Sequence, residues 1–235
     1  MATCDGPGDI KLLPGKPRSG GRPRSEANRR SILAAAMKLL EHQTVQSVTS
    51  EAIAVEAGVG KATIYRWWSS KVSVVIDAFI EHQLPHTSMD KDAHPAEALL
   101  KHWRMMAQQY SGKAGDIASQ IIAAGQSEPV IMAEFLSKFH VERAAMARGT
   151  VERLMRAVPS IRERIAEERF MELFYSPIHT RLLLRHHPID REFIQTFPVD
   201  FFRVFGVEFD DGGRLRSLPR AGSDTATGKI VRAKQ

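Results

Sequence analysis

The sequence predicts an all-α fold, in which three short N-terminal helices containing a helix-turn-helix are joined by a fourth helix to a larger C-terminal helical domain. Apolar residues recur at three- and four-residue spacing in almost every segment between residues 25 and 210. No Asn-Gly or Asp-Gly turn is flanked by alternating apolar residues, so we expect no β-hairpin. The apolar content of 43% is ordinary for a globular protein and supplies enough side chains for a buried core.

The composition excludes several classes of protein. Cys4 is the only cysteine, which excludes a disulfide scaffold and a multi-cysteine metal site within one chain. No apolar run approaches the roughly 18 residues that span a bilayer. The N-terminus lacks the apolar core of a secretory signal, so we expect a cytoplasmic protein.

The net charge of +6 lies at the two ends of the chain. Residues 1–84 hold 11 basic and 8 acidic groups, residues 85–210 hold 16 and 17, and residues 211–235 hold 6 and 2. Glycine, proline and basic residues predict a flexible basic arm over residues 1–24, and a disordered basic tail over residues 211–235. Between them we expect a helix-turn-helix domain over residues 25–84 and a helical domain over residues 85–210.

Capping signals place the first four helices. Ser25 is the expected N-cap of a helix over residues 25–41, and Thr49 is the expected N-cap of a short second helix that ends at Gly58. A third helix over residues 61–67 follows after a three-residue turn, and Ser70 caps the fourth. The expected core positions are Ile32, Leu33, Ala36, Leu39 and Leu40, then Ile53, Ala54 and Ala57, then Val74, Val75, Ala78 and Phe79.

Prolines and capping residues also delimit the later helices. Pro95 and Pro129 suit the first turn of helices over residues 95–110 and 129–157, with another helix over residues 116–125. After Pro159, Ser160 is expected to cap a long helix to about His186 that is kinked at Pro177, and Asp190 to cap a last helix to about Phe205 that is interrupted at Pro198.

Two short helices joined by a glycine-containing turn form the helix-turn-helix geometry. The outward face of the third helix carries donors and aromatic groups with no acid among them: Lys61, Thr63, Tyr65, Arg66 and Trp67. Successive helical residues point about 100° apart, so Trp68 is expected to pack between the third and fourth helices while Trp67 faces outward.

The run GVGKATIYRWWSSK, preceded by GRPRSEANRRSILAAA, resembles the N-terminal domain of TetR-type transcriptional regulators over roughly residues 20–80. The matching positions are Gly58, Val59, Thr63, Ile64, Tyr65, Trp67, Ser70 and Lys71. The resemblance implies a partner, double-stranded DNA with a near-palindromic operator, and a homodimer that places two recognition helices in successive major grooves.

The resemblance also implies roles for individual residues. Lys61 and Thr63 would reach base edges, Tyr65 would pack on the sugar–phosphate backbone, and Arg66 and Trp67 would flank it. The expected phosphate contacts are Lys71 at the start of the fourth helix and Thr49 and Ser50 at the start of the second.

Two features near this motif leave alternatives open. Glu51 departs from the family, whose members often carry a neutral or basic residue there; it would lie close to phosphate or would instead support the N-terminus of its helix through the helix dipole. Arg22 and Arg24 resemble residues that enter a narrow minor groove, the alternative being a general attraction to phosphates.

The C-terminal domain carries candidate pocket and interface residues. The family resemblance implies an effector cavity between helices for a small, largely apolar molecule, and methionines suit such a cavity because they repack around different ligands. The candidate lining residues are Trp103, Met106, Tyr110, Met132, Phe135, Phe139, Met171 and Tyr175, each of which is otherwise an ordinary core residue. The last two helices resemble the pair that forms the family's dimer interface, with candidates Leu173, Ile178, Leu182, Ile194 and Phe201.

These observations predict a homodimeric, ligand-responsive transcriptional regulator, most often a repressor in this family. We expect no enzymatic activity, no cofactor and no metal, because the chain has no nucleotide-binding glycine loop, nucleophile motif or cluster of metal ligands. His186 and His187 precede Pro188 and lack a third ligand at a suitable spacing. The alternatives are a non-specific DNA-binding protein without an effector and an all-α enzyme that uses the C-terminal cavity.

Overall fold

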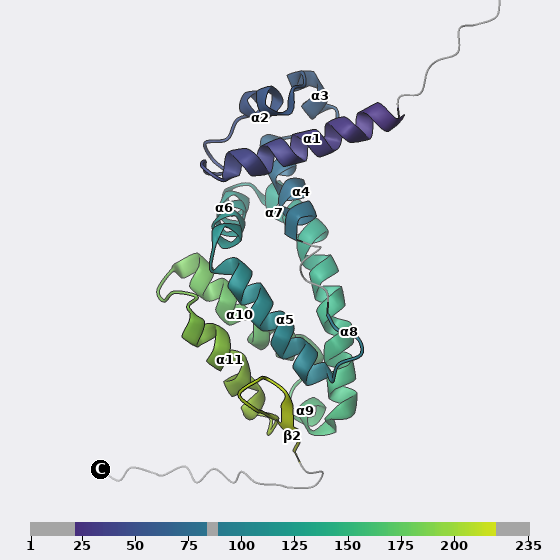
Figure 1. Cartoon of the computed structure of the whole chain (residues 1–235), viewed down its shortest axis with the longest axis vertical. Helices are drawn as coiled ribbons and strands as arrows, with labels where there is room; N and C mark the ends of the chain where they lie inside the picture. The colour runs from purple at the N-terminus through teal and green to yellow at the C-terminus, as the bar shows by residue number, and fades with distance from the viewer. Residues whose placement is uncertain (1–21, 84–88, 220–235) are drawn as a thin grey trace, which may run out of the picture.

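In the computed structural model, which describes residues 22–83 and 89–219, the first four helices form a small unit at one end of an elongated molecule (Figure 1). They are α1 (Arg22–Leu40), α2 (Ser50–Ala57), α3 (Lys61–Tyr65) and α4 (Lys71–Gln83). Helix α1 contacts both α2 and α4. The apolar positions predicted for this unit are buried, with Leu39 and Ala57 partly buried. The helices therefore share one core beneath α2 and α3.

The predicted caps of α2 and α4 are confirmed. The Thr49 side chain accepts a hydrogen bond from the amide of Ala52, and Gly58 closes α2 in the left-handed conformation with φ +65°. Glycine has no Cβ to oppose that conformation. The hydroxyl of Ser70 accepts a hydrogen bond from the amide of Ser73 at 3.1 Å. Local chemistry therefore fixes the turn that places α3.

Helix α1 begins three residues earlier than predicted. It starts at Arg22, so Ser25 lies inside the helix and is not its N-cap. Pro23 is tolerated there because the first-turn amides of a helix have no intrahelical partner. Residues 1–21 of the predicted arm lie outside the described residues.

Seven further α-helices lie within residues 89–219. They are α5 (Pro95–Tyr110), α6 (Lys113–Ser127), α7 (Pro129–Phe135), α8 (Val141–Ala157), α9 (Pro159–Arg164), α10 (Glu167–Leu184) and α11 (Arg191–Arg203). A π-helical turn, η2 (Leu136–His140), joins α7 to α8, so the predicted helix over residues 129–157 is continuous but not α-helical throughout. The Asp190 side chain accepts from the amide of Phe193 and caps α11 as predicted.

An aromatic cluster holds α5, α10 and α11 together. Trp103 on α5 is fully buried, and its indole nitrogen donates to the carbonyl of Phe174 on α10 at 2.8 Å. The same indole ring stacks on Phe197 of α11 with centroids 5.1 Å apart. Offset aromatic pairs add stability beyond the area they bury.

Two predictions for this region are wrong. The helix expected over residues 160–186 is broken, because Ile165 adopts an extended conformation between α9 and α10, and Ser160 caps neither helix. The hairpin that we did not expect is formed by β1 (Glu208–Phe209) and β2 (Leu215–Ser217), which pair antiparallel. The amide of Leu215 donates to Glu97 on α5 at 2.6 Å, so the ordered chain extends beyond the predicted domain end at residue 210. Residues 220–235 lie outside the described residues.

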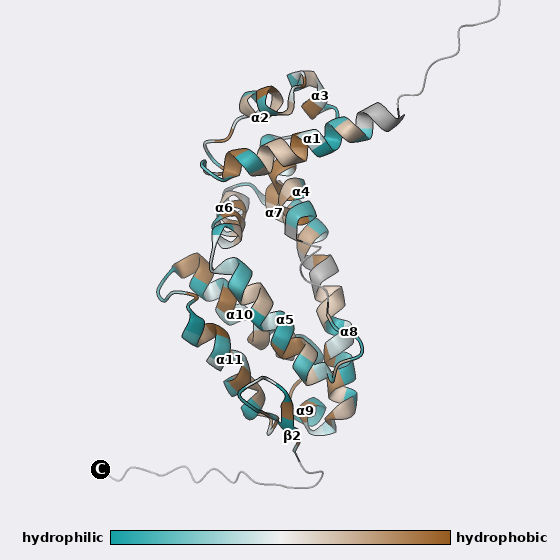
Figure 2. Ribbon diagram, in the orientation of Figure 1, coloured by the Kyte–Doolittle hydropathy of each residue, from teal (hydrophilic) through white to brown (hydrophobic). Residues whose placement is uncertain are grey.

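Hydrophobic and hydrophilic residues alternate along α1, α5 and α11 (Figure 2). Within residues 22–83 and 89–219, no helix combines the length and the apolar character needed to cross a membrane.

Candidate nucleic-acid interface and internal cavity

Helices α2 and α3 lie at the end of the molecule farthest from the C-terminal helices (Figure 1). The Tyr65 hydroxyl donates to the Ser50 hydroxyl at 3.2 Å and joins the end of α3 to the start of α2. Ser50 is buried, whereas Thr49 beside it is exposed. Of the two residues predicted to contact phosphate here, Thr49 is therefore at the surface and Ser50 positions Tyr65.

Helix α3 and the turn after it carry the predicted DNA-contacting side chains, because the helix ends at Tyr65 and not at residue 67 as predicted. Lys61, Tyr65, Arg66 and Trp67 are exposed, and Thr63 is partly buried. The Lys61 ammonium forms an ion pair with Glu51 on α2 and lies 5.7 Å from the centroid of the Tyr65 ring. Hydrogen bonding within this pair lowers the pKa of Glu51 and raises that of Lys61, so both groups are charged at neutral pH.

Lys71 has an intramolecular role that the sequence did not indicate. Its ammonium donates to the carbonyl of Gln46 at 2.5 Å and to that of Val48 at 2.7 Å. These carbonyls belong to the loop between α1 and α2. An ammonium has three donors, and two of them therefore hold this loop against the start of α4.

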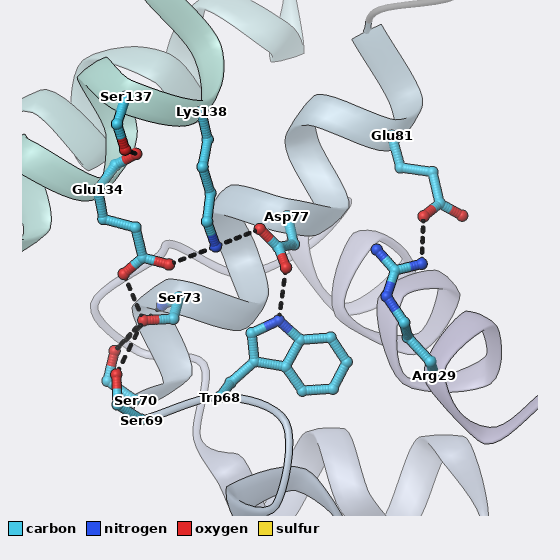
Figure 3. A network of polar contacts seen from close by, with 10 residues as sticks. All are labelled: Arg29, Trp68, Ser69, Ser70, Ser73, Asp77, Glu81, Glu134, Ser137 and Lys138. Atoms are coloured by element: carbon cyan, nitrogen blue, oxygen red, sulfur yellow. Dashed lines mark hydrogen bonds and ion pairs between the residues drawn. The ribbon is translucent and has the colours of Figure 1, made fainter. Parts of the chain in front are cut away.

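Trp68 is buried as predicted, and it begins a polar cluster that reaches the C-terminal domain (Figure 3). Its indole nitrogen donates to Asp77 on α4 at 2.8 Å. Lys138, in the η2 turn, donates to the other oxygen of Asp77 at 2.8 Å and to Glu134 at 2.7 Å. Glu134 also accepts from the Ser73 hydroxyl at 2.7 Å, so the cluster joins α4 to α7 and η2 by several charged hydrogen bonds.

Burial lowers the pKa of Lys138, but hydrogen bonds and charges from Asp77 and Glu134 outweigh it and raise the pKa overall. Lys138 is therefore a cation at neutral pH, which suits the two carboxylates that it joins.

A cavity of about 400 Å³ lies between α5, α8 and α10, a size within the range of ligand pockets. Of the predicted residues, Met106, Tyr110, Phe139, Met171 and Tyr175 line it. Polar side chains complete the lining: His102, Arg148, Glu168, Glu172, Ser176 and His179. The nitrogen Nδ1 of His102 lies 3.1 Å from the Tyr175 hydroxyl, within hydrogen-bond distance.

Three predicted cavity residues lie elsewhere. Trp103 belongs to the aromatic cluster of α5, α10 and α11, and Phe135 stacks on Phe139 with centroids 5.0 Å apart without lining the cavity. Met132 packs closely against Gly125, where α6 meets α7. Their apolar side chains are used in packing between the chain's own helices.

Some of the predicted interface residues are at least partly accessible at the surface, and the others are buried in the chain's own core. Leu173 is 53% exposed and Phe201 is partly buried. Ile178, Leu182 and Ile194 are buried in the core of the chain itself and are not available to a partner. The side chains of Arg22 and Arg24 lie outside the described part of the chain.

Two family models match the chain in succession. The model of bacterial regulatory proteins of the TetR family matches residues 32–78, which include the helix-turn-helix, and that of the tetracycline-repressor-like C-terminal domain matches residues 94–197. The chain belongs to the TetR family of transcriptional regulators. It is thus a DNA-binding regulator, and the face of α2 and α3 is its candidate DNA-binding surface.

Curated relatives and solved structures agree with membership in the TetR family. An uncharacterized HTH-type transcriptional regulator of Bacillus subtilis (strain 168), YdeS, is 29% identical over 183 residues, covering 78% of this chain and 92% of the relative. An uncharacterized HTH-type regulator of Mycobacterium tuberculosis (strain ATCC 25618 / H37Rv) is 42% identical over 50 residues, covering 21% of this chain and 25% of its own length.

The solved structures share the fold. The crystal structure of the TetR family regulator SCO0332 superposes with a TM-score of 0.64 at 22% identity, covering 75% of this chain and 97% of that one. A putative TetR-family regulator from Mesorhizobium loti superposes with a TM-score of 0.55 at 14% identity, covering 79% and 98%.

Proposed function

We propose that this regulator is a homodimeric repressor that leaves a near-palindromic operator when a small, largely apolar molecule enters the cavity between α5, α8 and α10. The observation that carries the proposal is the position of Phe139. Phe139 lines the cavity, and the residue before it, Lys138, forms a hydrogen bond with Asp77. Asp77 in turn accepts a hydrogen bond from Trp68, which directly follows the turn at the end of α3.

The chemistry of the cavity favours a ligand with an apolar body and a polar group. Methionine, alanine and aromatic side chains supply apolar contacts at Met106, Phe139, Ala147 and Met171. Carboxylates, imidazoles and hydroxyls from α5 and α10 supply hydrogen-bonding partners on the other walls. Such a combination orients a ligand while burying most of its surface.

The response to a ligand requires that it bind one arrangement of the helices better than another. A molecule that displaces Phe139 would also move the η2 turn, because the two residues Lys138 and Phe139 are adjacent. It would thereby strain the hydrogen bonds from Lys138 to Asp77 and Glu134, which join the two parts of the chain. A state with these bonds rearranged would hold α3 differently and would bind the operator less tightly.

A second copy of the chain is proposed to cover the outer face of α10. Leu173 and Leu184 are 53% and 71% exposed and lie eleven residues apart, which is about three helical turns, so they share one face. Exposed leucines aligned on one face of a helix are typical of an interface. Two-fold symmetry of such a dimer would match a palindromic operator.

Gel-shift titration with DNA from upstream of the protein's own gene tests operator binding. We expect a saturable complex that a hundredfold excess of random DNA does not displace. A panel of small apolar phenols, aromatic acids and fatty acids, first selected by their effect on thermal unfolding, then tests release of that complex. If no selective complex forms, operator binding is contradicted; if the complex forms but no binding compound weakens it, only the ligand response is contradicted.

A further inference from the structure

The ion pair between Glu51 and Lys61 joins the first turn of α2 to the first residue of α3. The two side chains are 62% and 48% exposed, although they contact each other. Helices α2 and α3, which carry the two residues, lie at the end of the molecule away from α5 and α10 (Figure 1). The charged pair therefore faces the DNA side of the helix-turn-helix.

This pair presents a hydrogen-bond donor beside an acceptor. In the major groove, a G·C base pair presents the O6 acceptor of guanine beside the N4 amino donor of cytosine. Lysine is a usual partner of guanine O6 and N7, and glutamate accepts from cytosine N4. Lys61 and Glu51 can therefore satisfy one G·C base pair together, without separating from each other.

The charge of Glu51 separates this role from general attraction to DNA. A carboxylate at the DNA surface repels phosphates, so it weakens binding to every sequence unless a base supplies it with a donor. It also neutralises Lys61, which would otherwise strengthen non-specific binding. A carboxylate that weakens binding to DNA in general is explained if it makes the protein prefer one DNA sequence over another.

We propose that Glu51 is a specificity-determining residue that reads a G·C base pair in each half of the operator together with Lys61. This rests on the operator binding proposed above. The carboxylate is directed to the ammonium of Lys61 and also accepts a hydrogen bond from its own backbone amide, so the proposed role is additional to the expected support of the α2 N-terminus.

Selection of binding sites from randomised DNA, carried out with the full-length protein, tests the proposal. For the wild type we expect a strong G·C preference at one position in each half-site. Glu51→Gln should reduce that preference by about tenfold and leave the other positions unchanged. Glu51→Asp should reduce it as well, because the shorter side chain keeps the charge but loses the reach.

Glu56→Gln is the matched control. Glu56 lies on the same helix and forms a comparable ion pair with Lys38 of α1 at 2.5 Å, away from α3. This variant should select the same sites as the wild type. Circular dichroism of all three variants should show the same helix content, because none of the altered side chains belongs to the core.

Two results would overturn the assignment. If Glu51→Gln strengthens binding to all sequences equally and Glu51→Asp behaves like the wild type, Glu51 acts only through its charge on phosphates. If both variants keep the G·C preference, another residue reads that base pair. A wild-type protein that selects no sequence at all would contradict the operator binding itself, which the first two results leave intact.

Discussion

The indole of Trp68, just after the end of α3, donates a hydrogen bond to the carboxylate of Asp77 at 2.8 Å. Trp68 is only 4% exposed, and the exposed Trp67 lies next to it in the chain. Two adjacent tryptophans therefore have different environments: Trp68 attaches the end of α3 to α4, and Trp67 is exposed at the surface.

Trp68→Phe should lower the free energy of unfolding by about 1 kcal/mol through the lost hydrogen bond, with a further loss from reduced packing. The phenyl ring keeps most of the apolar volume but leaves Asp77 without its indole donor. Urea unfolding followed by circular dichroism measures the change. Trp67→Phe is the control and should alter stability by less than about 0.5 kcal/mol, since that side chain is 40% exposed. Equal effects of the two variants would contradict a contribution of the hydrogen bond between Trp68 and Asp77 to stability.

The pairing of Lys138 predicts an alkaline pH dependence. Its pKa is raised in the folded chain, so its pairing stabilises the fold fully below the ordinary lysine pKa of about 10.4 and is lost as the pH rises through the folded value. Lys138→Met should therefore be destabilised relative to the wild type at pH 7 to 9, with the difference shrinking above about pH 10.4. Urea unfolding across this range measures the difference; one that stays constant up to pH 11.5 would show that Lys138 does not titrate as a paired cation.

Local signals explain why the helix-turn-helix was predictable. Thr49, Gly58 and Ser70 act on residues within a few positions, so the sequence contains the whole cause of each cap. The break at Ile165 has no proline or glycine, and it arises where the chain packs Ile165 against the core. The hairpin contains an Asp211-Gly212 turn signal, but its strands are too short to show an alternation of apolar and polar residues. The hydrogen bond from the amide of Leu215 to Glu97 joins residues 118 positions apart, so no local pattern could predict it.

The cavity was predicted only in part because apolar character does not distinguish a pocket wall from a packed core. Trp103 and Phe135 were expected in the cavity and lie in the core, and Ile178 was expected in an interface and is fully buried. The polar lining of α10 was missed although it follows one helical face. Glu168, Glu172, Ser176 and His179 recur at the same three- and four-residue spacing as Met171 and Tyr175, and this spacing was the signal in the sequence from which a polar wall could have been predicted.

Lys71→Ala should weaken binding to every DNA sequence and reduce the slope of log affinity against log salt by about 1, as the loss of one phosphate contact predicts. It should also lower stability by about 1 kcal/mol, because the carbonyls of Gln46 and Val48 lose their donor. Fluorescence anisotropy at several salt concentrations and urea unfolding measure the two effects. An unchanged salt slope with reduced stability would leave Lys71 with only its intramolecular role.

Leu173→Glu combined with Leu184→Glu should convert the proposed dimer to a monomer. Two carboxylates on one face of α10 would have to be buried without partners in the dimer, whereas both positions are exposed in the single chain. Size-exclusion chromatography with light scattering measures the mass. Val130→Glu is the control on α7, where the side chain is 79% exposed, and it should leave the mass unchanged. A double variant with the wild-type mass would place the interface elsewhere.

Ala147→Leu should fill part of the cavity and abolish the ligand response while leaving operator binding intact. Ala147 is 2% exposed and lines the cavity from α8, so a larger side chain there occupies the space of a ligand. The neutral fluorophore N-phenyl-1-naphthylamine reports on the cavity: its fluorescence should rise with the wild type and much less with Ala147→Leu. Ala145→Leu, at an exposed position of the same helix, should behave as the wild type in both assays. If Ala147→Leu binds the fluorophore as well as the wild type does, the fluorophore does not occupy this cavity. If the operator complex of Ala147→Leu is also still released by ligand, the ligand that causes release binds elsewhere.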